Sequence, residues 1–355
     1  MAAALSEITT RRGWAIQPLS LNDSPSGHAL AIGGQNVEFR GFGRDKLKFV
    51  VAAIREANRH DRSIILAAHP HLAPPAACAK FGASQARMIV VSHGVEVWKP
   101  LPWLRGRCLR RADVALAPSR DTAEKLAAVQ GVAPEKIRVL AWPLSSSFLE
   151  MANHPATLPL PPSFPSGRVI LTVGRWAASE RYKGVDDLIR AAAQLRPSFP
   201  GLQMVAVGDG DDLPRLRQVA AEAGATELVH FLRDLSREQL AACYAQADIF
   251  ALPSSGEGFG LVFLEAMAFG KPVVGASCGG TTDVVEDGVN GLLVPTHNPD
   301  ALAGALGRLL ASDSLREQLG RRGAELVRSR YSFEVFVSCL ETILERCSVD
   351  SAGAA

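Results

Sequence analysis

The sequence predicts an α/β protein of two domains, each built around a doubly wound parallel sheet. Three observations support this prediction. In the second half of the chain, short buried strands alternate with helices, and repeated βα units are typical of parallel sheets. The first half adds buried strands at 63–67, 87–91 and 112–117. A chain of 355 residues is also too long for one ordinary core.

Composition excludes several classes of protein. Hydrophobic residues make up 47% and charged residues 21%, as in soluble globular proteins. No run of eighteen apolar residues occurs, which argues against a membrane-spanning protein, and the first residues lack the features of a signal peptide. The six cysteines form no C-x-x-C pair. We therefore expect reduced thiols, mostly in the core, and a cytoplasmic location.

The net charge of +2 hides an asymmetry between the two halves. Residues 1–150 carry 20 Lys and Arg against 12 Asp and Glu, a balance of +8, whereas residues 151–355 carry 18 against 24, a balance of −6. A basic half followed by an acidic half indicates a different partner for each.

No strand is predicted before the first helix, so we expect the chain to start inside the first helix of an α/β domain. Five prolines between residues 153 and 167 predict an interdomain linker. We accordingly expect an N-terminal domain at 1–155 and a C-terminal domain at 156–325. We also expect a final helix at 326–355, and its return to the first domain is one alternative. For the first half we expect helices at 3–12, 46–58 and 120–129, the last capped by Ser119, and strands at 14–19, 37–40, 63–67, 87–91, 112–117 and 136–140.

The second half is a cleaner alternation of strands and helices, which favours the parallel-sheet interpretation. We expect strands at 169–173, 202–207, 228–232, 247–253, 271–274 and 292–294, and helices at 185–195, 213–223, 237–246, 261–269 and 282–286, with further helices from Asp300 onward.

A glycine-rich turn between the strand at 247–253 and the helix at 261–269 is the strongest local signal. Its glycines at positions 256, 258 and 260 allow backbone to approach a ligand closely. The N–H groups and the dipole of the following helix favour an anion. Glu257 and Glu265 frame the turn, and carboxylates accept hydrogen bonds from sugar hydroxyls. The combination predicts a phosphorylated sugar or a nucleotide, in preference to two solvated glutamates on a crossover helix.

Histidines follow two of the buried strands in the first half. His93 comes after the strand at 87–91, where open α/β sheets place ligands, so a catalytic or acceptor-binding role stands beside a core histidine bonded to backbone. His69 and His71 follow the strand at 63–67. Metal binding by this pair is disfavoured because no carboxylate or cysteine partner is near in sequence.

The segment from Trp98 to Arg111 is basic and rich in apolar residues. It interleaves five basic residues with two tryptophans and three leucines. We favour a basic helix whose apolar side packs in the domain. The alternative is a weak contact with an anionic membrane surface, or the lining of an acceptor groove.

Several of these stretches occur together in one known family. They are the glycine turn with Glu257 and Glu265, Gly174-Arg175 with Lys183-Gly184, Val207-Gly-Asp-Gly210, Gly279-Gly280 with the turn at 287–294, His93–Trp98 and Ala112–Ser119. In this combination the chain resembles the retaining, nucleotide-sugar-dependent glycosyltransferases of family 4. The resemblance spans about residues 30–295 and implies the GT-B fold, in which two Rossmann-like domains face each other across a cleft.

The resemblance also implies roles for individual residues. Arg175 and Lys183 would hold the donor diphosphate, Glu265 the ribose and Glu257 the donor sugar. His93 would act near the reacting carbon and the acceptor, which makes His93, Glu257, Arg175 and Lys183 the implied catalytic set. The remaining donor-binding residues would be Gly174, Gly258, Phe259, Gly260, Leu261 and Arg233.

A family 4 enzyme of this kind would move a mannose- or glucose-type hexose to a glycan or lipid-linked acceptor, for example in cell-surface or exopolysaccharide synthesis. The family needs no metal or cofactor besides its nucleotide-sugar donor, and no nucleic-acid partner is expected. The resemblance implies that the protein is located in the cytoplasm, and the alternative is a peripheral location on the inner face of the membrane. A sugar-nucleotide-binding protein without transferase activity is the alternative. An epimerase or phosphorylase of the same fold is disfavoured because neither acid/base carboxylates nor a pyridoxal-phosphate lysine is evident.

Three features depart from the family pattern. The first strand and glycine-rich loop of the N-terminal domain have no counterpart in this sequence. Arg233 stands where the family usually has glycine, and Trp142-Pro143 replaces a common Asn-Gly or Asn-Pro. The last two indicate subfamily variation.

Overall fold

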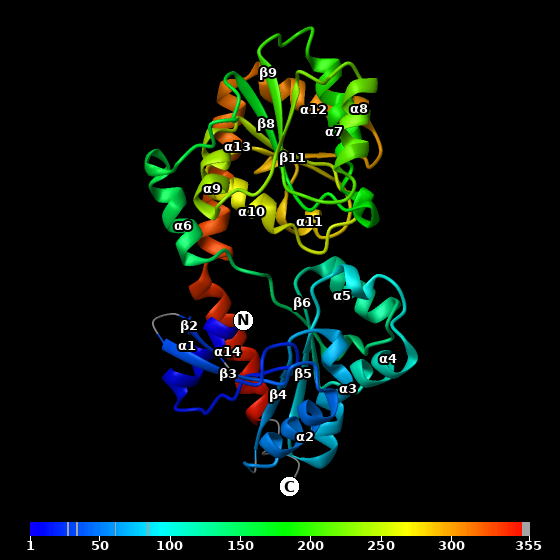
Figure 1. Ribbon diagram of the computed structural model, residues 1–355, viewed down its shortest axis with the longest axis vertical. Helices are drawn as coiled ribbons and strands as arrows, with labels where there is room; N and C mark the ends of the chain where they lie inside the picture. The colour runs from blue at the N-terminus through cyan, green and yellow to red at the C-terminus, as the bar shows by residue number, and fades with distance from the viewer. Residues whose placement is uncertain (27, 33–34, 61, 84, 350–355) are drawn as a thin grey trace. The chain divides into compact units, whose positions relative to one another are not determined.

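The computed structural model describes residues 1–26, 28–32, 35–60, 62–83 and 85–349. The chain divides into two compact units, which are drawn in Figure 1. Unit 1 is Met1–Ala141 with the described part of the segment that begins at Phe333, and unit 2 is Trp142–Ser332. The described strands form parallel sheets of four and six strands and a smaller sheet of three. The α/β class predicted from the sequence is therefore confirmed.

The strands of the four-stranded sheet of unit 1 all run parallel. Its order follows the chain, because each crossover moves the next strand outward on the same side. The reversal of a doubly wound sheet was expected in both domains, but the described strands of unit 1 do not show it. The strands, in spatial order, are β4 (Ile64–Ala67), β5 (Arg87–Val91), β6 (Val114–Ala117) and β7 (Ile137–Val139).

A separate small sheet precedes these strands. β1 (Leu19–Ser20) pairs in parallel with β3 (Gln35–Gly41), and β3 pairs in antiparallel with β2 (His28–Ile32). The strand expected at 14–19 is wrong over 14–18, where the chain is irregular. Pro18 has no N–H to donate to a ladder, which limits pairing at this point.

The core of unit 1 lies between the four-stranded sheet and its crossover helices. Met88 and Val90 of β5 are fully buried there against Leu109 and Leu126. The C-terminal helix belongs to this unit, since Glu341 forms ion pairs with Arg11 and Arg12 of the first helix. The helices are α1 (Ala2–Arg12), α2 (Lys46–Ala57), α3 (Ala73–Gly82), α4 (Trp103–Arg110), α5 (Arg120–Ala128) and α14 (Phe333–Val349), with 3₁₀ turns at Pro70–Leu72, Val95–Val97 and Pro134–Lys136.

The six-stranded sheet of unit 2 is doubly wound, as predicted. Its strands run parallel, and the order reverses between β8 and β11. Apolar residues fill both of its faces, as expected for strands covered by helices on two sides (Figure 1). In spatial order the strands are β10 (Val229–Leu232), β9 (Leu202–Val207), β8 (Arg168–Val173), β11 (Ile249–Leu252), β12 (Val273–Ala276) and β13 (Gly291–Val294).

Helices cover the sheet of unit 2 through apolar stripes. Leu188 and Ile189 of α7 pack with Leu306 of α12 in its largest core cluster. Gly320 of α13 approaches the end of α10 so closely that a Cβ there would lie 1.8 Å from the Gly270 carbonyl oxygen. The helices are α6 (Ser146–Asn153), α7 (Val185–Leu195), α8 (Leu213–Glu222), α9 (Arg237–Gln246), α10 (Leu261–Ala268), α11 (Thr281–Val284), α12 (Pro299–Ala311) and α13 (Asp313–Arg330), with 3₁₀ segments at Pro155–Thr157 and Ala178–Lys183.

The unit boundaries lie at 141/142 and 332/333, whereas the sequence suggested 155/156 and 325/326. Contacts within unit 2 account for the difference. The Leu144 N–H donates to the Tyr331 carbonyl (3.0 Å), and the Phe148 ring packs edge-on against Tyr244 and Phe269. The proline-rich stretch 153–167 therefore begins inside unit 2, at the last residue of helix α6.

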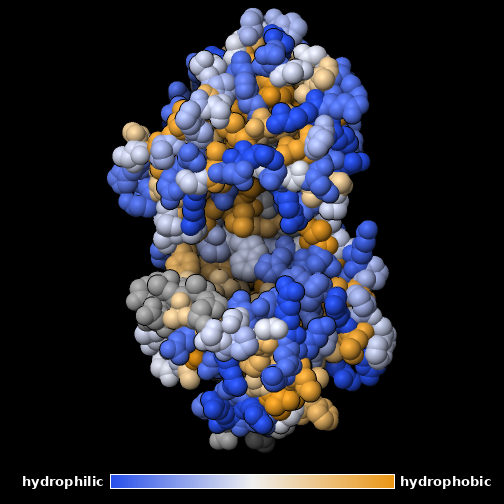
Figure 2. Space-filling model, viewed as in Figure 1, coloured by the Kyte–Doolittle hydropathy of each residue, from blue (hydrophilic) through white to orange (hydrophobic). Residues whose placement is uncertain are grey.

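Surface features match the composition. Figure 2 shows groups of hydrophobic residues among hydrophilic ones on the face that it draws. Within the described residues, none of the helices combines the length and the apolar character needed to span a bilayer. All six cysteines are free, as expected, but only Cys108, Cys243 and Cys347 are buried, whereas Cys78 and Cys339 are exposed.

Candidate functional site

The strand order of unit 2 places a candidate site between β8 and β11. Parallel α/β sheets bind ligands at the C-terminal ends of the strands that flank a reversal of strand order. Gly174 and Arg175 directly follow β8, and Pro253 directly follows β11. The predicted glycine-rich turn thus begins at this switch point.

Gly260 shapes the entry into helix α10. It is the N-cap residue and has a φ of 91°, in the left-handed region that favours glycine. A Cβ at this position would lie 2.7 Å from Cδ2 of Phe263, so a larger residue would collide with the first turn of the helix. The turn therefore brings backbone groups to the positive end of the helix dipole.

The loop after β12 supports the back of this turn. The Gly280 N–H donates to the Glu257 carbonyl (2.7 Å). A Cβ at Gly280 would lie 2.6 Å from the Gly258 carbonyl oxygen, and Gly279 has a φ of 60°. The Gly279-Gly280 pair noted in the sequence thus allows two backbones to touch and holds Glu257 in place.

The segment after β8 meets the glycine-rich turn from the other side. The Ser255 N–H donates to the Tyr182 carbonyl (2.7 Å). Gly184 has a φ of 70°, and a Cβ there would lie 2.5 Å from the Pro253 carbonyl oxygen. These contacts bring Lys183 beside the turn that carries Glu257.

Lys183 and Glu257 influence each other electrostatically. Burial lowers the pKa of Lys183, the charge of Glu257 opposes this shift and Arg175 adds to it. Burial raises the pKa of Glu257, and the charge of Lys183 opposes that shift. Predicted site residues from two different loops therefore share one partly buried region, where charges interact more strongly than in water.

Glu180 joins the two predicted cations, although the sequence did not single it out. Its carboxylate forms an ion pair with the Arg175 guanidinium and another with the Lys183 ammonium, at 3.1 Å. The Glu180 and Lys183 side chains are 10% and 15% exposed, whereas Arg175 is 73% exposed. The signal available in the sequence was an acidic residue between the two basic ones.

Trp176 packs against the same segment. Its side chain is buried, and the Lys183 ammonium lies 5.9 Å from the centre of its ring. The Trp176 N–H donates to the Asp209 carbonyl (2.8 Å), and the Asp212 N–H donates to the Trp176 carbonyl (2.9 Å). Trp176, Glu180, Lys183 and Asp212 all line one small hollow on the surface of unit 2.

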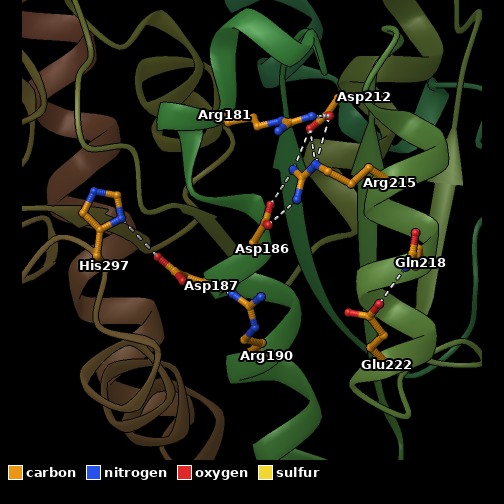
Figure 3. Close-up of polar contacts among 9 residues, drawn as sticks. All are labelled: Arg181, Asp186, Asp187, Arg190, Asp212, Arg215, Gln218, Glu222 and His297. Atoms are coloured by element: carbon orange, nitrogen blue, oxygen red, sulfur yellow. Dashed lines mark hydrogen bonds and ion pairs between the residues drawn. The ribbon is translucent and has the colours of Figure 1, made fainter.

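A network of four charged side chains holds this segment to the starts of α7 and α8 (Figure 3). Asp212 accepts hydrogen bonds from Arg181 at 2.8 and 3.0 Å and from Arg215 at 2.6 to 3.0 Å. Arg215 also binds both carboxylate oxygens of Asp186. The Asp212 side chain is 5% exposed, and its hydrogen bonds with Arg215 lower its pKa. The network fixes Arg181, which directly follows Glu180, and Asp186, so that anchored residues flank Lys183.

Glu265 lies farther along helix α10 and has its own partner. The Tyr244 hydroxyl donates to its carboxylate at 2.7 Å. Burial and the charge of Glu265 raise the pKa of Tyr244 well above its usual value, so the phenol stays protonated. Burial raises the pKa of Glu265, opposed by the Tyr244 hydrogen bond and by Arg237. Sequence reasoning missed Tyr244 because nothing in its spacing marks it as a partner of Glu265.

The predicted donor-site residue Arg233 lies beyond the end of β10 and is exposed. It forms an ion pair with Asp209, which follows β9, at 3.3 Å. The C-terminal ends of β10, β9, β8 and β11 therefore carry Arg233, Asp209, Arg175 and the glycine-rich turn in sequence across the sheet.

Two family models match the chain. "Glycosyltransferase Family 4" matches residues 3–143, and "Glycosyl transferases group 1" matches residues 162–326. The chain belongs to glycosyltransferase family 4. The matches cover both units and agree with the arrangement of charged residues at the switch point.

Curated relatives of this family 4 chain include D-inositol 3-phosphate glycosyltransferases. The protein from Acidothermus cellulolyticus is 36% identical over 61% of this chain and 50% of the relative. The protein from Corynebacterium jeikeium is 38% identical over 50% of this chain and 43% of the relative. The chain thus spans about half the length of the curated relatives it matches.

Solved structures share the fold. HepE from Anabaena, crystallised with UDP, has a TM-score of 0.70 at 22% identity, covering 84% of this chain and 82% of that one. Sucrose-phosphate synthase from Thermosynechococcus elongatus has a TM-score of 0.69 at 22% identity, covering 96% and 91%. The family 4 chain therefore has the GT-B fold that its sequence motifs implied.

His93 lies in unit 1 of the family 4 chain, after β5. Its side chain is exposed, its Nε2 atom is 2.9 Å from the Ala68 carbonyl oxygen, and its ring stacks on His69 with centres 5.6 Å apart. The backbone contact is a feature of a structural histidine, and the accessible ring is a feature of a catalytic or acceptor-binding one. Within the described residues, no group of three or more His, Cys, Asp or Glu side chains is arranged to hold a metal.

The segment from Trp98 to Arg111 is partly packed and partly exposed. Gln130, which is buried, donates to the Val97 and Lys99 carbonyls at 2.8 and 2.7 Å and thereby holds the start of the segment. Cys108 and Leu109 of α4 are buried. In contrast, the Trp103 side chain is 71% exposed and that of Leu104 is 53% exposed.

Proposed function

We propose that this family 4 chain is a retaining hexosyltransferase. It transfers a mannose- or glucose-type hexose from a nucleotide diphosphate sugar to a glycan or lipid-linked acceptor, as in cell-surface or exopolysaccharide synthesis. One observation carries the proposal: Lys183, which shares the Glu180 carboxylate with Arg175, lies beside the glycine-rich turn that carries Glu257 and precedes helix α10.

The diphosphate of the donor binds Arg175, Lys183 and the N-terminus of α10. A guanidinium, an ammonium and a helix dipole supply the positive charge that a departing diphosphate needs. Lys183 is mostly buried, so its interaction with phosphate is stronger than it would be in water. These fixed cations perform the task that a divalent metal performs elsewhere, and the transfer requires no metal.

The sugar and the nucleoside bind on either side of the diphosphate. Glu257 and the backbone of residues 258–261 hold the donor sugar, and Glu265 holds the ribose hydroxyls. Tyr244 keeps the Glu265 carboxylate oriented for that task. Arg233, which is exposed beyond β10, contributes on the nucleoside side.

The reaction exchanges one bond at the anomeric carbon and keeps the configuration. The bond from that carbon to the diphosphate oxygen breaks, and the acceptor oxygen forms the new bond on the same face. The acceptor oxygen attacks the anomeric carbon directly, so no enzyme nucleophile is needed, and the acceptor proton passes to the departing diphosphate. His93 of unit 1 serves the acceptor side. Exclusion of water from the donor prevents hydrolysis.

Relatives support the donor class. Solved complexes of HepE contain UDP, and UDP with glucose. The curated relatives are named for glycosyl transfer to an inositol phosphate. We infer a hexose donor with a nucleoside diphosphate leaving group, of which uridine derivatives are the first to test.

A thermal-shift screen followed by turnover tests the proposal. The full chain is incubated with UDP, GDP and ADP and with their glucose or mannose derivatives, and ligands that raise the Tm are assayed with a panel of glycan and lipid acceptors. We expect stabilisation by one nucleotide series and release of its nucleoside diphosphate with an acceptor. Stabilisation without turnover would favour the alternative, a sugar-nucleotide-binding protein. Absence of any shift would contradict both.

A further inference from the structure

The two cations assigned to the donor diphosphate are already paired with a carboxylate of the same chain. One oxygen of Glu180 faces the Arg175 guanidinium, and the other lies 3.1 Å from the Lys183 ammonium. The Glu180 side chain is 10% exposed. A diphosphate that binds both cations therefore approaches a fixed negative charge.

The backbone of Glu180 is anchored on both sides. The Glu180 N–H donates to the Ala177 carbonyl (2.8 Å), and the Ala178 N–H donates to the Asp211 carboxylate (2.7 Å). On the other side, Arg181 donates twice to the buried Asp212. The backbone anchors keep the Glu180 side chain next to both cations, and its two ion pairs orient the carboxylate toward them.

The fixed charge affects the donor and the product differently. A nucleotide diphosphate sugar carries two negative charges on its diphosphate. The released nucleoside diphosphate has a terminal phosphate that gains a further negative charge, with a pKa near 6 as for other phosphate monoesters. A carboxylate beside the phosphate-binding cations therefore repels the product more than the donor.

We propose that Glu180 is a positioning residue that holds Arg175 and Lys183 in place and weakens the binding of the nucleoside diphosphate product relative to the sugar donor. This inference rests on the proposed function of the same site. It assigns to Glu180 a role in product release, which limits turnover in many enzymes.

The test compares wild-type protein with Glu180→Gln, Glu180→Asp and the control Glu222→Gln. Glu222 is a glutamate of α8 whose carboxylate accepts a hydrogen bond from Gln218 (2.8 Å, Figure 3), so the control removes the same charge elsewhere in unit 2. Isothermal titration calorimetry measures the Kd of UDP and of UDP-glucose for each protein at pH 8, and of GDP and GDP-mannose where the guanine series is the one that binds. Thermal melts check that each variant is folded.

We expect Glu180→Gln to bind the nucleoside diphosphate about tenfold more tightly and the sugar donor less than threefold more tightly, as removal of one nearby like charge predicts. Its kcat should fall because product leaves more slowly, and its donor KM should fall too. Glu180→Asp keeps the charge and should keep the wild-type ratio of the two affinities, as should Glu222→Gln.

Two outcomes would overturn the inference. One is a folded Glu180→Gln protein whose ratio of product to donor affinity equals that of wild type. The other is a Glu180→Gln protein that binds the product more weakly than wild type. Wild-type protein that binds neither series would instead contradict the proposed function, so the two failures are distinguishable.

Discussion

The Tyr244 hydroxyl donates a 2.7 Å hydrogen bond to the Glu265 carboxylate, from the fully buried ring of α9 to the side of α10. The ring also stacks on Phe269, with centres 6.2 Å apart and planes 9° apart. A rigid, protonated phenol thus fixes a carboxylate that the proposed function assigns to ribose. This hydrogen bond orients the carboxylate of Glu265, a residue predicted from the sequence, as a hydrogen-bond acceptor.

Replacing Tyr244 with phenylalanine should weaken donor binding. A hydrogen bond to a charged group contributes about 1.5 kcal/mol, which corresponds to about a tenfold higher Kd for the nucleotide sugar. Titration calorimetry checks this. Tyr331→Phe is the control, because it removes a hydroxyl bonded to the Asp283 carbonyl (3.2 Å) and keeps its ring. Equal Kd values for wild type and Tyr244→Phe would contradict the role of the pair.

Alanine at Lys183 or at Glu257 should abolish most of the transfer while the protein still folds. Each residue contributes charge at the reacting end of the donor, and loss of one such group costs about 10²- to 10³-fold in kcat. Initial rates of nucleoside diphosphate release provide the measurement. Arg190→Ala is the control, because Arg190 is a half-exposed cation of the same unit that pairs with Asp187. Near-parental rates in both variants would remove these two roles.

The buried ammonium of Lys183 should make stability depend on pH in a defined direction. Burial lowers its pKa below the usual 10.5, so the unfolded chain holds more protons than the folded chain between the two values. Stability from this group is therefore smallest at low and neutral pH and increases as the pH rises through the folded pKa toward 10.5. Lys183→Met lacks this titration.

Urea unfolding of wild type and Lys183→Met at several pH values between 7 and 10 measures this effect. We expect the free energy of unfolding of wild type to increase relative to that of the variant across this range. Subtracting the free energy of unfolding of the variant from that of wild type cancels the contributions of groups that titrate in both proteins. A difference that is constant or decreases with pH would show that Lys183 is not destabilised by burial.

Breaking the network under the donor segment should destabilise unit 2. Arg215→Met leaves the buried Asp212 with the hydrogen bonds from Arg181 and removes the tie to Asp186. We expect a loss of about 2 kcal/mol in the free energy of unfolding at pH 7. Arg215→Lys should not restore it, because an ammonium cannot bind two carboxylates in the same forked geometry.

The stability that this network contributes should depend on pH in the acidic range. Hydrogen bonds with Arg215 lower the pKa of Asp212 below 3.8, so the stability that they contribute is present above that value and is lost as the pH falls through the folded pKa. The difference between wild type and Arg215→Met should therefore shrink under acidic conditions. A difference that persists at the lowest pH at which both proteins fold would contradict this assignment.

The exposed Trp103 and Leu104 allow a test of the membrane-contact hypothesis. Sedimentation with phosphatidylglycerol vesicles at low salt should recover wild-type protein, and Trp103→Ala should reduce the recovered fraction several-fold, as expected for an interfacial aromatic residue flanked by basic ones. Phe81→Ala is the control, because Phe81 is 92% exposed and lies outside this segment. Absence of wild-type protein from the vesicles at every salt concentration would contradict the hypothesis.

The elements of unit 2 were predictable because each carries a strong local signal. Helices α7 and α9 and strand β9 lie at the residues expected from apolar spacing. Ser236 forms a capping box with Gln239 at the start of α9, which marks that boundary in the sequence itself. In unit 1, the weakly patterned stretch at 14–19 had no comparable signal, and the prediction of a strand over its first five residues was wrong.

The site was predictable as a set of residue types but not as a set of contacts. The carboxylates, the cations and the glycines that follow the strands were apparent from the order of elements and from the family resemblance, and their individual roles stay predictions. Glu180, Trp176, Tyr244 and Asp212 were missed. Each acts through a partner that is distant in sequence or that local spacing does not identify.

The alternation of strands and helices, the glycine-rich turn and the kinds of charge that follow β8 and β11 could be predicted from residue order, because periodicity, capping and backbone freedom are local properties. Which charges meet depends on contacts between loops that are distant in the chain. Gly184 lets its loop touch Pro253, and Gly280 lets the loop after β12 touch Gly258. Electrostatic and hydrogen-bond energies fall steeply with distance, so these close approaches between separate loops, set by packing, place Lys183 beside Glu257.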